Sequence, residues 1–275
     1  MSYHLLWAHK RLLVFPCISS VAALAVSASF ILPLWQTGAL AEWAEFMDQQ
    51  AASQGNAVMW VIVFLFYFCN YFVIAFFNTG LIASVLSIIN GNGASVSYGI
   101  SFAVKRLPQI LDWSFVAAFV GVLLKAIEKS NKKAGAIVSA ILGSAWTALA
   151  YFVVPVIVLD GVGPIKAFKR SAQTLKTTWG TALVGNFSLG FFSFLVMLPV
   201  VLLVVVLFGM AVAAESVVVT AFAGAVAVLA IALACAATSA ADVVFKAYLY
   251  TYATGRSIPE DVDTTAFGDA FRARK

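Results

Sequence analysis

The feature that most limits the fold of this sequence is the run from Ala57 to Ile89, which contains no charged residue. A transmembrane helix needs about 20 predominantly apolar residues to cross a hydrocarbon core about 30 Å thick. The whole chain is similar, because 63% of its 275 residues are hydrophobic and 11% are charged, whereas soluble domains carry about 25% charged residues. Lipid accommodates so much apolar surface and water does not. The sequence therefore predicts an integral membrane protein.

Six runs of this kind predict an all-α fold, a polytopic transmembrane helix bundle that forms a single membrane domain over residues 1–275. The predicted spans cover residues 12–35, 57–89, 110–124, 134–159, 181–208 and 217–241, and the last continues as a helix to about residue 252. A cytoplasmic tail is expected at residues 254–275. Pro155 lies inside the fourth run, where the missing N–H of proline is expected to kink the helix.

Lysine and arginine in the connections predict the orientation of the spans, since short cytoplasmic loops of membrane proteins are enriched in both. Basic residues precede the first span and follow the second, fourth and sixth, whereas residues 37–56 contain acidic residues and no basic one. Both termini are therefore expected in the cytoplasm, in a multi-pass protein of a cell membrane, the cytoplasmic membrane of a bacterium. The basic connection Lys125–Lys133 does not fit, because alternation places it outside. Four spans plus a re-entrant hairpin of the third and fourth runs are the alternative.

The stretch Pro164–Trp179, PIKAFKRSAQTLKTTW, has the pattern of an amphipathic helix in the membrane interface. Its apolar residues recur at steps of three and four, and basic residues occupy the rest of the surface. The stretch Ser95–Leu107 is a weaker version of the same pattern. The residues expected to contact anionic lipid or a soluble cytoplasmic partner are Lys166, Phe168, Lys169, Arg170, Lys176, Trp179, Lys105 and Arg106. The alternative role is a loop helix that only orients the neighbouring spans.

A stripe of small residues marks the fourth span at every fourth position, namely Ala136, Ala140, Ser144 and Ala148. Small stripes let two helix backbones approach closely, and packing is the main cohesive term between helices in lipid. We expect this stripe to pack in the interior of the bundle. Contact with a second copy in a homo-oligomer is the competing use.

Few polar residues interrupt the runs, and each of them is a candidate for function because polar groups are costly in a membrane. Asp242 and Lys246 are four residues apart, so they can form an ion pair on one helical face. We expect this pair near the cytoplasmic interface. Asn70 and Asn78 lie within the second span, where we expect them to bond to neighbouring helices.

Several short segments resemble a family of uncharacterised bacterial and archaeal polytopic membrane proteins, known as a domain of unknown function. These segments are Trp7…Lys10-Arg11-Leu12-Leu13, Phe76-Phe77-Asn78-Thr79, Gly143-Ser144-Ala145-Trp146, Phe152-Val153-Val154-Pro155, Lys169-Arg170-Ser171 and Thr178-Trp179-Gly180. The resemblance covers nearly the whole chain, and the family implies no activity.

A second resemblance is confined to residues 155–179. The pattern Pro155…Asp160-Gly161…Ala167…Arg170-Ser171…Leu175…Trp179 is similar to the membrane domain attached to some glycerophosphodiester phosphodiesterases. Those domains often have glutamate where Asp160 stands. No phosphodiesterase domain is recognised in this sequence, so the resemblance does not imply that activity.

No motif for metalloprotease, serine hydrolase, P-loop or dinucleotide chemistry occurs in the sequence. The two histidines, His4 and His9, do not share a helical face. We therefore expect no catalytic residue, no metal and no cofactor.

The net charge of +5 comes from short clusters between apolar runs, which is typical of loops that face anionic lipid, so nucleic acid is not an expected partner. The leading hypothesis is a non-enzymatic membrane scaffold or lipid-interacting module with a basic cytoplasmic face, and the alternative is a small transporter or channel.

Overall fold

The computed structural model describes residues 6, 8–39, 57–130, 134–214 and 216–255. Within these residues the chain is all-α, and six helices are long and apolar enough to cross a membrane. The elements are η1 (Lys10–Leu13), α2 (Val14–Gln36), α4 (Ala57–Ile89), α5 (Val96–Lys105), α6 (Leu107–Ser130), α7 (Ala134–Leu149), α8 (Val153–Asp160), α9 (Pro164–Ala214) and α10 (Val217–Ala253). The predicted class, an all-α polytopic helix bundle, is confirmed. The predicted tail lies outside the described residues from residue 256 onward.

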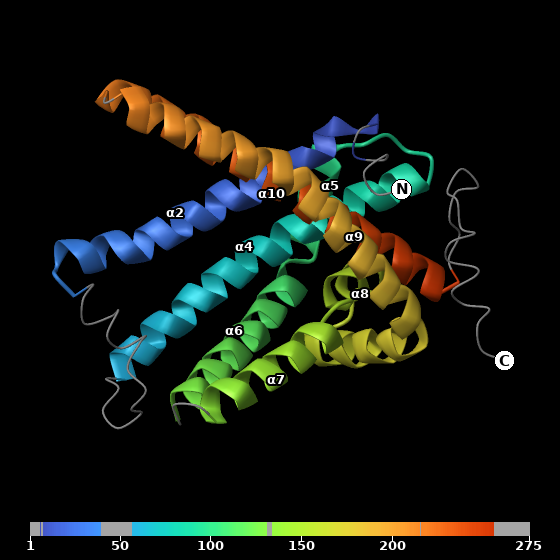
Figure 1. Ribbon diagram of the computed structural model, residues 1–275. Coiled ribbons are helices and arrows are strands. Elements are labelled where there is room, and N and C mark those ends of the chain that lie inside the picture. Colours follow the sequence, from blue (N-terminus) through green and yellow to red (C-terminus); the bar gives the residue numbers. More distant parts are fainter. Residues whose placement is uncertain (1–5, 7, 40–56, 131–133, 215, 256–275) are drawn as a thin grey trace.

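The helices converge at one end of the molecule and spread apart away from it (Figure 1). The buried side chains lie where they converge, in two clusters that draw on α4, α8 and α10. In contrast, no residue is buried in Ser193–Met210, the most apolar stretch of α9. Its exposed side chains are large and apolar, which suits a surface covered by lipid tails. The folded core is therefore concentrated at one end.

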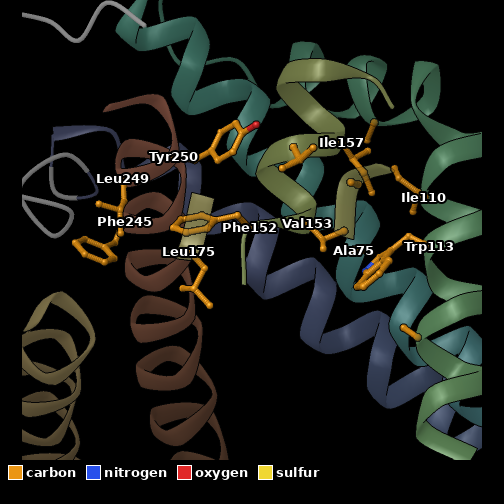
Figure 2. Close-up of a cluster of buried hydrophobic side chains, with 14 residues drawn as sticks. Ala75, Ile110, Trp113, Phe152, Val153, Ile157, Leu175, Phe245, Leu249 and Tyr250 are labelled. Carbon is orange, nitrogen blue, oxygen red and sulfur yellow. The ribbon is translucent and has the colours of Figure 1, made fainter. Parts of the chain in front are cut away.

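One buried cluster joins α4, α5, α6, α8, α9 and α10 around the break between α7 and α8 (Figure 2). Phe152 and Val153 lie at its centre, and α10 contributes Phe245, Leu249 and Tyr250. The ring of Phe152 packs 5.8 Å from that of Tyr250. Because each of these side chains is at most 9% exposed, dispersion contacts hold α8 and α10 together here.

The third apolar helix, α6, is longer than the predicted span of residues 110–124. It has 24 residues, or about 36 Å at 1.5 Å per residue, enough to cross the hydrocarbon core. It forms an antiparallel pair with α7, in which the Ser139 hydroxyl donates to the Leu124 carbonyl oxygen over 2.9 Å. The last turn of α6 and the first turn of α7 lie at the end of the bundle where α2 ends and α4 begins (Figure 1). A shallow re-entrant hairpin is therefore not needed to accommodate these two helices.

The predicted interfacial helix and the fifth span form one continuous helix. Helix α9 has 51 residues, about 75 Å of length, and starts directly after the turn Gly161–Gly163. Gly161 caps α8 with a φ of +63°, a left-handed conformation that favours glycine. Gly38, Gly91 and Gly255 follow α2, α4 and α10 with positive φ as well, so the same turn chemistry ends four of the described helices.

Candidate functional site at the basic end

Exposed cations gather where α5 and α9 meet the packed core, and we call this region the basic end. It is defined by Lys105, Arg106, Lys166, Lys169, Arg170 and Lys176. The four lysines are exposed, and Arg106 is half-buried. Helix α9 carries four of the six cations on its first turns and continues into the apolar stretch that crosses the membrane. The basic end is therefore rigidly linked to a spanning helix.

The amphipathic part of α9 buries a different face from the predicted one. Ala167, Ser171, Leu175 and Thr178 are buried against the rest of the chain, while Ile165 is 68% exposed. The helix predicted to lie in the membrane interface therefore packs one face on the protein core, which also fits the alternative role of a helix that orients the neighbouring spans. The side chain of Trp179 lies outside the described residues.

Phe168, predicted to contact the membrane or a partner, instead ends a stack of three aromatic rings. The Trp146 ring lies 5.5 Å from that of Trp113 with an interplanar angle of 12°. On its other side the Phe168 ring lies at 5.0 Å and 19°. The stack connects α6, α7 and α9, and aromatic pairs of this kind contribute about 0.5–1.5 kcal/mol beyond their area burial.

Ser171 closes the break between α7 and α8. Its hydroxyl donates to the carbonyl oxygen of Leu149 over 2.6 Å and accepts the N–H of Phe152 at 2.9 Å. The break precedes Pro155, which lies in the first turn of α8, where a missing N–H is tolerated. Non-helical backbone at membrane depth is stable only where the protein satisfies its polar groups. One buried hydroxyl therefore makes the kinked fourth span possible.

Asp160, at the last residue of α8, connects three helices. Its carboxylate accepts hydrogen bonds from Nη1 of Arg170 at 2.7 Å and from the Tyr250 hydroxyl at 2.8 Å. The Asp160 side chain is 8% exposed, whereas that of Arg170 is 50% exposed. Arg170 from α9 and Tyr250 from α10 thus both bind a nearly buried carboxylate. We call these three residues the Asp160 clamp.

Arg106 covers the turn that follows Asp160. A Cβ added at Gly161 would contact Nη1 of Arg106 and lie 2.7 Å from its Cζ and 2.8 Å from its Nη2. The guanidinium also lies 5.4 Å from the ring centroid of Phe102. The positive φ therefore favours glycine at position 161, and a Cβ there would displace the Arg106 guanidinium.

The predicted ion pair on α10 is present. Nζ of Lys246 lies 2.6 Å from Oδ2 of Asp242. The same ammonium lies 4.7 Å from the ring centroid of Tyr151, beside the α7–α8 break. The pair is partly exposed, so it contributes little to stability by charge alone.

Of the two asparagines of α4, Asn70 bonds within its own helix. Its Nδ2 donates to the carbonyl oxygen of Phe66 over 2.9 Å. The expected bonds from Asn70 and Asn78 to neighbouring helices stay a prediction. Asn78 is half-buried. Next to it, Thr79 Oγ1 is buried and has no hydrogen-bond partner among the described residues.

The small stripe of α7 does not pack inside the monomer. Ala136, Ala140 and Ser144 are exposed, and Ala148 is half-buried. The prediction of interior packing is wrong for the first three, because α7 meets α6 through its neighbouring face, on which Ser139 bonds to Leu124. The stripe remains free for another contact.

The Asp160 clamp and the Arg106–Gly161 contact were not predicted from the sequence as sites. A local signal existed, because Asp160-Gly161 ends an apolar helix and the basic stretch that contains Arg170 follows directly after the turn. The partner Tyr250 lies ninety positions away, which no local pattern connects. Among the described residues, no group of three or more His, Cys, Asp or Glu side chains is arranged to hold a metal ion.

The fold and this site define a multi-pass α-helical integral membrane protein with a basic, packed end. A family model described as a family of unknown function (DUF6159) matches residues 57–258, well over half of the chain. The chain belongs to that family. A comparison with curated proteins finds no match, and a comparison with solved structures finds none either.

Proposed function

We propose that this protein is a non-enzymatic membrane module whose basic end binds anionic lipid headgroups. The exposed lysines of α5 and α9 carry this proposal. Lys105, Lys166, Lys169 and Lys176 take part in none of the ion pairs found among the described residues. Each lysine or arginine near an anionic bilayer surface contributes about 1 kcal/mol of attraction.

The rigidity of the basic end supports this role. The core packs around α8, α10 and the first turns of α9, so these lysines are displayed on a preorganised surface. A binding surface that is already ordered loses less conformational entropy on binding. We place this surface, with both termini, at the cytoplasmic face of a bacterial cell membrane, where anionic lipid and the basic loops would meet. The similarity of residues 155–179 to a phosphodiesterase-attached membrane domain stays a prediction and adds no activity.

The test uses the purified full chain in a neutral detergent, titrated with phosphatidylglycerol or phosphatidylcholine, with bound lipid counted by native mass spectrometry. We expect more phosphatidylglycerol than phosphatidylcholine to be retained, and this excess should fall at high salt. The double variant Lys166→Gln/Lys169→Gln should lose much of the excess. Lys132→Gln/Lys133→Gln, which removes equal charge between α6 and α7, should keep it. Equal retention of both lipids by the unchanged protein would disprove the proposal.

The second candidate function is a small transporter or channel. The observation in its favour is the unpartnered Thr79 hydroxyl oxygen beside Asn78 on α4, since polar groups inside membrane helices mark transport pathways in other proteins. A cysteine at Asn78, in a chain whose native cysteines are replaced, tests this function. Reaction with a small charged thiol reagent in intact vesicles would favour a polar path. Protection from that reagent would argue against it.

A further inference from the structure

The geometry points to a phosphate-binding site formed by Arg106 and Arg170 around the Asp160–Gly161 turn. This inference rests on the proposed function and deepens it, because it names the group that binds and the side chains that hold it. The phosphate belongs to a lipid headgroup or to free phosphate, and both present the same oxygens to a guanidinium.

Arg106 is a half-buried cation beside the turn. Its guanidinium lies flat against Gly161 and over Phe102, and it is half-buried. Among the described residues, the ion pairs are Lys125–Glu128, Arg170–Asp160 and Lys246–Asp242, so Arg106 pairs with no described carboxylate. A partly desolvated cation without a counter-charge is costly. An anion from outside the protein would remove that cost.

Arg170 is held at the same turn by Asp160. One of its nitrogens, Nη1, is used by Asp160, which holds the side chain in place. A guanidinium has five N–H donors in a planar fork, and the Arg170 side chain is 50% exposed, so donors remain toward solvent. Asp160 and Gly161 are consecutive, so the two guanidinium groups lie at neighbouring positions of one turn. Asp160 therefore orients the Arg170 guanidinium, and Gly161 leaves the space that the Arg106 guanidinium occupies.

The charge around the Asp160–Gly161 turn also favours an anion. The turn leads into α9, whose first N–H groups have no intrahelical acceptor and whose positive dipole end favours an anion. Lys166, in the first turn of α9, is exposed. Among the described residues at this turn, the carboxylate of Asp160 is outnumbered by Arg106, Arg170 and Lys166. The balance of charge at the turn is positive.

The chemistry of the two arginines selects phosphate over other anions. Guanidinium groups bind phosphate oxygens in a bidentate manner, whereas lysine acts as a point charge. The exposed lysines of the basic end therefore attract anionic lipid in general, and the arginine pair recognises the phosphate. Loss of the arginine pair would therefore remove phosphate recognition and leave the general attraction to anionic lipid.

The experiment measures retention of phosphatidic acid by the full chain in neutral detergent, by native mass spectrometry. Arg106→Lys keeps the charge and removes the fork, so retention should fall about tenfold. Lys133→Gln, which removes a charge outside the basic end, should change retention less than twofold. Inorganic phosphate at millimolar concentration is the second probe. Displacement of the lipid by it assigns the site to free phosphate, and retention of the lipid assigns it to a headgroup.

A second variant covers the case in which Arg106→Lys fails to fold. Gly161→Ala displaces the Arg106 guanidinium without changing charge, whereas Gly91→Ala introduces the same side chain at a positive φ with nothing within 4 Å. Retention should fall in Gly161→Ala and stay unchanged in Gly91→Ala. Equal retention in all these variants would overturn the phosphate site. If phosphatidylglycerol binding still depended on Lys166 and Lys169, the proposed function would survive that result.

Discussion

The hydroxyl of Tyr250 donates to Oδ2 of Asp160 over 2.8 Å, although ninety positions separate the two residues. This bond ties the last turns of α10 to the last residue of α8. It also adds a second donor to a carboxylate that Arg170 binds from the partly exposed side. The basic end is thus held together by a nearly buried negative charge.

Replacing Tyr250 with phenylalanine tests the strength of this connection. A hydrogen bond to a charged group contributes about 1.5–3 kcal/mol, so we expect Tyr250→Phe to lower stability by about 2 kcal/mol. Thermal unfolding in a mild detergent, followed by circular dichroism, measures the change. Tyr98→Phe is the matched control, because Tyr98 is 47% exposed. Equal melting temperatures for the two variants would contradict the clamp.

Ser171→Ala should destabilise the fourth span at its break. The substitution leaves the Leu149 carbonyl and the Phe152 N–H without the partner that they share. A buried polar group left unsatisfied costs about 1–3 kcal/mol, and we expect a loss at the upper end of that range. Ser144→Ala is the control, since the exposed Ser144 hydroxyl bonds only within its own helix. A loss no larger than that of the control would refute the bridging role.

Gly161→Ala and Gly91→Ala separate backbone strain from crowding. Both positions have positive φ, so each alanine should cost about 1 kcal/mol from conformation. Only the alanine at position 161 would displace the Arg106 guanidinium. Because that group is the far end of a flexible side chain, we expect the displacement to add about 1 kcal/mol, the low end of the cost of overpacking. In the double variant Gly161→Ala/Arg106→Ala, the extra loss should be recovered. Chemical denaturation of the unchanged protein, the two single variants and the double variant measures the free energy of unfolding. If the double variant were as unstable as Gly161→Ala, the strain would not come from Arg106.

Trp146→Ala should remove the middle ring of the aromatic stack. Trp146 lies between Trp113 and Phe168, so its loss separates α6, α7 and α9 at one point. Core Trp or Phe to Ala changes cost about 3–5 kcal/mol, and we expect about 3 kcal/mol because Trp146 is half-buried. Trp35→Ala, at a residue 67% exposed, should have little effect on the unfolding temperature. Similar losses at both positions would rule out the stack as a stabilising element.

Cysteine labelling tests the side on which the α6–α7 connection lies. In a chain without native cysteines, Thr37→Cys and Ser130→Cys should react with an impermeant reagent from the same side of oriented vesicles. Asn92→Cys should react only from the opposite side, because α4 separates it from the end at which α2 finishes (Figure 1). All three residues are exposed. Labelling of positions 130 and 92 from one side would instead restore the re-entrant hairpin.

In the amphipathic stretch of α9, the basic residues could be predicted from the sequence, but what covers the opposite face could not. Its basic residues were correctly identified as a cluster, and the structure leaves its lysines exposed. The apolar face was assigned to lipid, but α9 buries Ser171 and Thr178 on the core side. Spacing alone locates the stripe of a helix but does not say whether protein or lipid covers it, since both accept apolar side chains.

The sequence by itself determined the solvent and the elements. Long runs without charge require a bilayer, and their lengths predict helices that cross it, because only hydrogen-bonded helices satisfy the backbone in lipid. Tertiary structure alone decided which polar groups meet. Asp160 with Tyr250, Ser171 with the α7–α8 break, and Arg106 with Gly161 are joined across long stretches of chain. The reason is physical, since periodicity encodes what one helix presents and not the partner that packs against it.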